Sequence, residues 1–370
     1  MSAPSQLRLV STYTAVHGAA EFLTALTLFS MLPAWGEGWL LAAYSAVAFG
    51  GPIAVAALTA GRLSGWREGW VGLAGTGLLA VGMLLCQVGW ACAVVLGAGS
   101  AALHIAAGTA TLKAPARGNA VGVFESSGAV GLALGSVVGA SVGPALAETA
   151  WIGVGAAAIA LGGLAVAAWG SDLRVVGLGA VVATGGPSRP IVSGRTPRPG
   201  AWTPPSGGLL AVAALVALSV ISVLRAVAGV AAPQPWKQGV ALVLAASVCV
   251  AAGRALGGVI ADRFGLAMPA IVGFVGAAAG LALWPDAAWA GLAGSFFLAL
   301  PMAPVIVGLV AVTGRPSLAF GLAQVCQVPS ALVGGLVLGP WAVLVVLLLC
   351  AAGIVWLAPL YGRRPAPAAG

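Results

Sequence analysis

The sequence predicts an all-α integral membrane protein in which twelve transmembrane helices form two six-helix halves. Hydrophobic residues make up 61% of the 370 residues and charged residues only 6%, whereas a soluble domain carries about 25% charged residues. Apolar runs of about 20 residues, the length that crosses a bilayer, recur along the chain. One long interval, residues 171–207, is rich in Pro, Gly, Ser and Arg and divides these runs six and six.

The expected spans follow one another with mostly short connections. Each is expected to be a helix, because a helix satisfies its own backbone hydrogen bonds where lipid offers none. In chain order the spans are 12–34, 38–60, 69–88, 91–112, 121–143, 148–170, 208–230, 239–261, 267–284, 289–311, 318–338 and 341–361.

The composition of residues 171–207 cannot build a hydrophobic core, so this interval is expected to be a flexible linker. The expected domains are an N-terminal half over 1–170, a cytoplasmic linker over 171–207 and a C-terminal half over 208–370.

Basic residues fall almost entirely on one side of this predicted topology. Thirteen lie in the terminal segments and in the loops after the even-numbered spans, and only Lys237 lies in the opposite loops. Basic loops stay in the cytoplasm. We therefore expect a multi-pass protein of the cell (inner) membrane with both termini and the linker cytoplasmic. The thirteen are Arg8, Arg62, Arg67, Lys113, Arg117, Arg174, Arg189, Arg195, Arg198, Arg263, Arg315, Arg363 and Arg364.

Several function classes are disfavoured. The net charge of +8 is spread singly between apolar runs and forms no stripe for nucleic acid. The five cysteines have no metal-ligand spacing, and no Walker A, HExxH or triad-like pattern occurs. We expect no enzyme activity, no metal and no cofactor. The expected partners are a small-molecule substrate, protons and the lipid bilayer, and the expected form is a monomer.

An internal repeat links the two halves. Residues 120–122 align with 319–321, Glu125 with Gln324 and Gly135 with Gly334, all at an offset of 199. Residues 62–69 align with 258–265 at an offset of 196. Two six-helix halves of one design are common in transporters.

The segment Gly258-x-x-x-Asp262-Arg263-x-Gly265 follows the eighth span. It resembles the signature loop of the major facilitator superfamily, and the twelve-span layout is similar to that fold. The resemblance implies that these four residues belong to a gate, with Asp262 capping or pairing near the inner end of the fifth span. A helix N-terminus favours such a carboxylate by about 0.3–1 kcal/mol. Trp66 replaces the acid in the first-half copy. The alternative is an ordinary basic loop with a chance Asp-Arg pair.

A narrower resemblance covers spans 1, 4 and 5. His17 and Glu21 in span 1, the run 97–104 ending in His104, and the run 118–128 are similar to the fosmidomycin-resistance group of drug exporters. Glu21 stands where that group has Asp, and Ile105 stands where it has Pro. The resemblance does not fix a substrate.

Span 5 also carries glycines four residues apart, which line one helix face and let a neighbouring backbone approach. The run resembles the glycine-rich fifth span of proton antiporters, and generic tight packing is the alternative. The glycines are Gly131, Gly135, Gly139 and Gly143.

Three titratable residues lie inside spans 1 and 4. A charge at a helix centre costs about 2.5–3.5 kcal/mol on insertion scales, so such residues are functional candidates. His17 and Glu21 are four residues apart and share a helix face. The superfamily resemblance implies that spans 1 and 4 line the central cavity, which brings His104 to them. We expect Glu21 to carry a proton and both histidines to tune it. A static hydrogen-bonded pair is the alternative.

Other polar residues inside spans have two interpretations each. The superfamily resemblance implies that spans 5 and 8 pack across the interface between the halves, where Glu125 and Arg254 would pair when the inside is closed. The alternative is that each extends to water or binds locally. Arg225 either attracts an anionic substrate group or extends outward to water. Gln324 and Gln327 contact substrate or form interhelical hydrogen bonds.

The expected function is secondary active transport, with proton-coupled export of a small drug or metabolite by alternating access. The alternatives are uptake of a nutrient or organic anion, and a non-transporting scaffold or sensor on the same fold.

Overall fold

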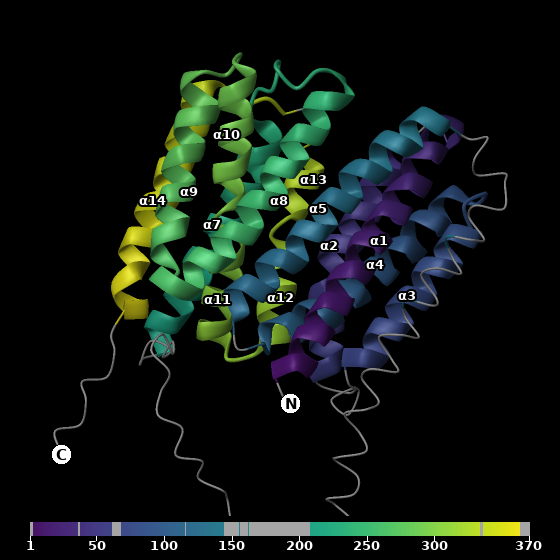
Figure 1. Cartoon of the computed structure of the whole chain (residues 1–370), viewed down its shortest axis with the longest axis horizontal. Helices are drawn as coiled ribbons and strands as arrows, with labels where there is room; N and C mark the ends of the chain where they lie inside the picture. The colour runs from purple at the N-terminus through teal and green to yellow at the C-terminus, as the bar shows by residue number, and fades with distance from the viewer. Residues whose placement is uncertain are drawn as a thin grey trace, which may run out of the picture.

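The computed structural model describes residues 3–35, 38–60, 68–114, 116–143, 155, 162, 208–333 and 336–362. The regular structure in these ranges is helical throughout. The helices form two bundles side by side, one from the first part of the chain and one from the second (Figure 1).

The first bundle is built around a central helix. It contains α1 (Ala3–Trp35), α2 (Trp39–Ala60), α3 (Glu68–Leu84), α4 (Gly89–Leu112) and α5 (Arg117–Val142). α4 packs against the other four helices, and most of its residues are buried. His104 therefore enters the bundle from its most enclosed helix.

The second bundle contains shorter helical pieces as well as long ones. They are α7 (Gly208–Ala231), α8 (Gly239–Phe264), α9 (Ala267–Ala278) with its π-helical end η2 (Ala279–Leu283), α10 (Ala288–Ala299), α11 (Met302–Thr313), α12 (Pro316–Val325), α13 (Val328–Leu332) and α14 (Pro340–Gly362).

Each described helix overlaps one of the sequence-based spans, although the boundaries differ and two of the spans are divided. Eight helical segments of the described residues are long and apolar enough to cross a membrane, and 68–84 and 267–283 are shorter apolar helices. The predicted span 148–170 lies outside the described residues apart from 155 and 162, as do the linker 171–207 and the loop 61–67. The all-helical membrane fold is confirmed, and the count of twelve stays a prediction.

Two predicted spans are interrupted, which the sequence-based boundaries missed. The span 289–311 is divided at Leu300–Pro301, and 318–338 is divided at Cys326–Gln327 and its second piece ends at Leu332. Proline explains both breaks. Pro301 and Pro329 have no N–H to donate to the carbonyl four residues earlier, so a helical hydrogen bond is missing at each break.

Glycines bring α1 and α5 into close contact over most of their length. A Cβ at Gly131, Gly135 or Gly139 would overlap the backbone of α1 at Gly18, Phe22 or Leu26. Gly143 differs from the sequence-based expectation, because it is the C-cap of α5 with φ of 64° and has no neighbour within reach of a Cβ. Three of the four glycines therefore form the seam that holds α1 against α5.

The two bundles meet through α5 against α8 and through α2 against α12. The contacts involve the beginning of α5 and the last part of α8, where a Cβ at Gly258 would overlap the carbonyl of Gly118. The equivalent approach in the other pair is Gly321 of α12 against Pro52 and Ile53 of α2. From these contacts α5 and α8 diverge toward the opposite end of the molecule (Figure 1).

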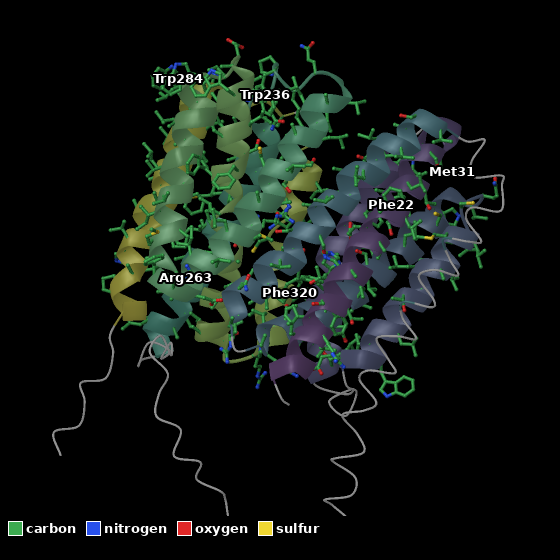
Figure 2. The ribbon with its side chains drawn as sticks, viewed as in Figure 1. Phe22, Met31, Trp236, Arg263, Trp284 and Phe320 are labelled. Atoms are coloured by element: carbon green, nitrogen blue, oxygen red, sulfur yellow. The ribbon has the colours of Figure 1, made fainter. Side chains whose placement is uncertain are left out.

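Charged and aromatic side chains mark the two ends of the second bundle. Trp236 and Trp284 lie at one end and Arg263 toward the other (Figure 2). Indole rings favour the interface between lipid and water.

The first and last helices have their outer ends on the same side of the molecule, because α1 begins at the end where α14 finishes (Figure 1).

Candidate functional site

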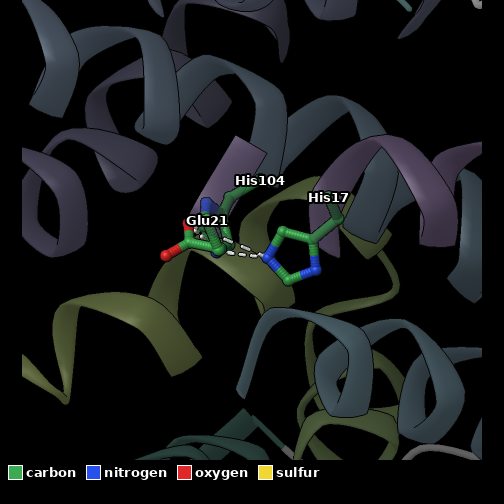
Figure 3. Close-up of side chains that lie close together, drawn as sticks. All are labelled: His17, Glu21 and His104. Atoms are coloured by element: carbon green, nitrogen blue, oxygen red, sulfur yellow. Dashed lines mark hydrogen bonds and ion pairs between the residues drawn. The ribbon is translucent and has the colours of Figure 1, made fainter. Parts of the chain in front are cut away.

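Two histidines and a glutamate come together inside the first bundle (Figure 3). Nε2 of His17 on α1 lies 3.1 Å from Nε2 of His104 on α4. Oε1 of Glu21, one turn after His17, lies 4.0 Å from Nε2 of His17 and 3.8 Å from Nε2 of His104. The side chains of His17, His104 and Glu21 are 2%, 9% and 13% exposed. We call these three residues the His–Glu cluster.

Neighbouring groups fix the orientation of both rings. Nδ1 of His17 lies 3.0 Å from the backbone oxygen of Phe124, whose ring stacks on the imidazole at a centroid distance of 4.0 Å. Nδ1 of His104 lies 2.8 Å from the backbone oxygen of Ser100. The Ser100 hydroxyl donates to Oε1 of Glu21 over 3.4 Å. Both Nε2 atoms therefore face each other and the carboxylate.

The two imidazole nitrogens and the carboxylate oxygen of the His–Glu cluster lie within 4.8 Å of one another, a spacing at which a metal ion is the alternative to a shared proton. Imidazole nitrogen and carboxylate oxygen suit zinc and similar ions. A proton shared among the three side chains would occupy the same nitrogen and oxygen lone pairs as a metal ion. The expectation that the protein holds no metal therefore stays a prediction.

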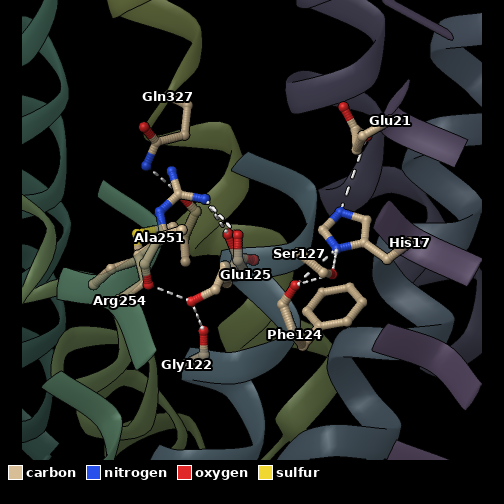
Figure 4. Close-up of polar contacts among 12 residues, drawn as sticks. His17, Glu21, Gly122, Phe124, Glu125, Ser127, Ala251, Arg254 and Gln327 are labelled. Carbon is tan, nitrogen blue, oxygen red and sulfur yellow. Dashed lines mark hydrogen bonds and ion pairs between the residues drawn. The ribbon is translucent and has the colours of Figure 1, made fainter. Parts of the chain in front are cut away.

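A second polar network crosses the interface between the bundles (Figure 4). Nη1 of Arg254 on α8 donates to the backbone oxygen of Glu125 over 2.8 Å and to its Oε2 over 3.3 Å. Nε2 of Gln324 on α12 donates to Oε1 of Glu125 over 3.2 Å. The Ser126 hydroxyl lies 2.6 Å from the backbone oxygen of Ala251. The structure thus brings Glu125 together with Arg254 and adds Gln324 to the pair.

Glu125 and Gln324 are also the residues that align in the internal repeat at an offset of 199. Two equivalent residues of a two-fold repeat can touch only if both lie near the axis that relates the repeats. Their hydrogen bond therefore supports the repeat and locates its axis between α5 and α12.

Arg225 on α7 is buried inside the second bundle and does not extend outward to water. The exposed fraction of Arg225 is 8%. Nη2 lies 3.1 Å from Sδ of Met302 and donates to Oε1 of Gln327 over 3.4 Å. Both partners are uncharged, and within the described ranges no carboxylate forms an ion pair with it. A buried cation without a counter-charge is costly, which makes this position attractive to an anion.

Asp262 connects the end of α8 to the beginning of α5. Oδ1 accepts from the backbone N–H of Gly118 over 3.0 Å, and Oδ2 accepts from that of Asn119 over 2.8 Å. These amides lie in the first turn of α5, where helix N–H groups lack intrahelical partners. Asp262 thus caps the first turn of α5, and Gly258 provides the close backbone approach beside it.

The two other residues of this loop have different surroundings. Gly265 ends α8 with φ of 90°, a conformation that residues with a Cβ rarely adopt. Arg263 is exposed beyond the Asp262 contact.

Sequence reasoning missed Phe124, Ser100 and Gly128. Phe124 stacks on His17, and a Cβ at Gly128 would overlap the same ring. The spacing of Ser100 and His104, one helical turn apart, is a signal that could have identified Ser100. Nothing local distinguishes Phe124 or Gly128, because their role depends on how α5 packs on α1.

Comparisons with known proteins find similarity in solved structures but not in sequence families. No protein-family model matches the chain, and no curated protein sequence matches it. Among solved structures, the human organic anion transporter MFSD10 (TETRAN) is 15% identical with a TM-score of 0.61, over 95% of this chain and 99% of that one.

A variant of the E. coli fucose:proton symporter FucP is 13% identical with a TM-score of 0.55, over 97% of this chain and 100% of that one. FucP in the outward conformation, described as a major facilitator superfamily transporter, is 16% identical with a TM-score of 0.51, over 95% of this chain and 100% of that one. At these identities the likeness concerns the fold.

Proposed function

Given a chain with the fold of major facilitator superfamily transporters, we propose that it is a secondary active transporter. It exports a small organic compound, a drug or a metabolite, by alternating access and in exchange for protons. The His–Glu cluster is the observation that carries this proposal. Ionisable side chains inside membrane helices are costly and are retained mainly for function.

In this proposal Glu21 exchanges the coupling proton with water, and His17 and His104 set its affinity. The cluster lies in α1 and α4, and Glu21 retains 13% side-chain exposure. A charge crossing the membrane releases about 2.3 kcal/mol per 100 mV, which is sufficient for tens-fold accumulation. The resemblance of spans 1, 4 and 5 to the fosmidomycin-resistance exporters supports export as the direction of transport.

Two interfacial contacts supply the gate. The Asp262 contact with α5 and the Glu125–Arg254–Gln324 network both join the bundles where α5 meets α8. They stabilise the conformation in which the bundles are closed together at the end where α5 meets α8. Both contacts must break before the molecule can adopt the conformation that is open at this end. The proposed orientation has this end in the cytoplasm of a cell-membrane protein, with the linker 171–207 between halves 1–170 and 208–370.

Glu21→Gln tests the coupling. Gln keeps the size and hydrogen bonding of Glu but cannot carry a proton, so proton-driven accumulation is expected to vanish while substrate binding persists. The measurement is a compound screen in everted vesicles with an imposed pH gradient, followed by flux in proteoliposomes normalised to folded protein.

Glu68→Gln is the matched control, because Glu68 pairs with Lys113 at the exposed ends of α3 and α4. Wild-type accumulation in the Glu21→Gln variant would exclude Glu21 as the proton carrier. Absence of flux for every compound with the wild-type protein would favour the scaffold or sensor.

Uptake of an organic anion is the second candidate, and Arg225 is the observation that favours it. Its guanidinium is buried beside Gln327 without a carboxylate partner in the described part of the chain. One similar structure is described as an organic anion transporter. Arg225→Gln should abolish transport of anionic compounds and spare neutral ones. Equal loss for both classes would contradict an anion site.

A further inference from the structure

The two imidazole rings of the His–Glu cluster face each other in a way that fixes their protons. Nε2 of His17 and Nε2 of His104 lie 3.1 Å apart, within the range of a hydrogen bond between nitrogens. The rings are nearly perpendicular, at 83°. Such a contact is attractive only if one of the two nitrogens carries a hydrogen.

The hydrogen-bond partner of Nδ1 in each ring determines whether that nitrogen carries a hydrogen. A backbone carbonyl oxygen can only accept, so the oxygen of Phe124 requires a hydrogen on Nδ1 of His17 and the oxygen of Ser100 requires one on Nδ1 of His104. The hydroxyls of Ser127 and Ser100 also lie near these nitrogens, and a hydroxyl can rotate to suit either role. A neutral imidazole carries one hydrogen. Two neutral rings would therefore place two lone pairs against each other.

We propose that His104 is the imidazolium of this pair and donates its Nε2 hydrogen to Nε2 of a neutral His17. This rests on the proposed function and identifies where the coupling proton is held in this conformation. The Glu21 carboxylate, 3.8 Å from Nε2 of His104, balances the charge. Within the part of the chain that the structure describes, the other charged and titratable groups that interact electrostatically with the cluster are Tyr44 on α2, Glu125 on α5 and Arg254 on α8. Glu21 is the only one of these within 4.0 Å of the rings.

The arrangement also relates protonation to conformation. Release moves the hydrogen from Nε2 of His104 to a Glu21 oxygen, which leaves a neutral imidazole and a carboxylic acid, and Glu21 is the most exposed member of the cluster. The two Nε2 lone pairs then oppose each other, so the rings must separate. One ring belongs to α1 and the other to α4. His17 is therefore a positioning residue: its Nε2 accepts the hydrogen of His104 only while α1 and α4 keep this distance.

The composition of the chain makes this directly measurable, since His17 and His104 are its only histidines. The full-length protein, purified with a histidine-free tag and labelled with 15N-histidine, gives four ring nitrogens in solid-state NMR. At neutral pH we expect hydrogen on both Nδ1 atoms, one hydrogen shared by the two Nε2 atoms, and a coupling between these two nitrogens.

His17→Asn should remove the shared hydrogen and leave His104 neutral with its hydrogen on Nδ1. Glu21→Gln should lower the shared population severalfold, and Glu68→Gln should leave it at the wild-type level. Two neutral rings without internitrogen coupling would overturn the proposal even where proton-driven transport persists. A spectrum that changes on dialysis against EDTA would overturn it too, by showing a metal ion in place of the proton. A shared hydrogen without proton-driven transport would instead contradict the proposed function.

Discussion

Glu125 accepts hydrogen bonds from two helices of the opposite bundle and is the most buried acid among the described residues. Arg254 binds Oε2 from α8, and Gln324 binds Oε1 from α12. The Glu125 side chain is 5% exposed and that of Arg254 is 22% exposed. A buried carboxylate is tolerated only when such partners satisfy it.

Glu125→Gln should therefore weaken the interface between the two bundles. A Gln amide can satisfy only one of the two donors and leaves Arg254 without its counter-charge. Leaving a buried polar group unsatisfied costs about 1–3 kcal/mol, so the unfolding midpoint of the purified protein in detergent is expected to fall. The exposed Glu68–Lys113 pair contributes about 0–1 kcal/mol, and a fall no larger than that of Glu68→Gln would contradict the assignment.

At the scale of elements, the α1–α5 seam positions both sides of the His–Glu cluster. α5 supplies the Phe124 carbonyl that orients His17, and its glycines bring that carbonyl within reach of α1. The cluster geometry thus depends on backbone packing several turns away.

Gly135→Ala should separate these two helices. The added Cβ would overlap the carbonyl of Phe22, and overpacking of this kind costs about 1–3 kcal/mol. Loss of thermal stability should accompany reduced proton-driven transport. Gly77→Ala on α3 is the control, because a Cβ there meets nothing within 4 Å and alanine favours a helix by about 1 kcal/mol. Equal stability of the two variants would show that the seam tolerates a methyl group.

The elements also show how far the sequence could predict this fold. Hydropathy predicted the helices because lipid imposes one length and one backbone solution. The i,i+4 spacing predicted that His17 and Glu21 share a face, and the family resemblance brought His104 to them. The breaks at Pro301 and before Pro329 were missed because prolines within membrane helices are often tolerated. Stacking of Phe124 on His17 depends on the rotation of α5 against α1, which no local pattern specifies.

At the scale of the whole molecule, the two bundles touch near one end and their helices diverge toward the other (Figure 1). Asp262 is the charged group at the edge of this contact, where it accepts from two amides of α5. An Asn at this position has one acceptor oxygen and an NH2 group that only donates, so one of the two hydrogen bonds is lost. The other is weakened, because hydrogen bonds to a carboxylate are about twice as strong as neutral ones.

Asp262→Asn should shift the population away from this conformation. With spin labels at Ala116 and Phe264, both exposed near the contact, the distribution of distances between the labels is expected to gain a longer component. Asp286→Asn, in the exposed turn before α10, provides the control. Identical distance distributions in the two variants would contradict the proposed role of Asp262 in the gate.

The basic residues predict the orientation of the whole molecule. Cysteines placed within 171–207 in a Cys-less background should resist an impermeant thiol reagent in intact cells and react after permeabilisation. Efficient labelling from outside intact cells would contradict the predicted cytoplasmic orientation of this interval.

The contact between Glu125 and Gln324 has a consequence for how such a chain could arise. If the two halves descend from one duplicated segment, this position once faced its own copy across the symmetry axis. Two glutamates there would repel each other, and two glutamines would give Arg254 no counter-charge. Only after the copies diverged could one side become an acid and the other an amide. Exchanging the two, as Glu125→Gln with Gln324→Glu, would therefore move the charge to the opposite half while keeping the hydrogen bond.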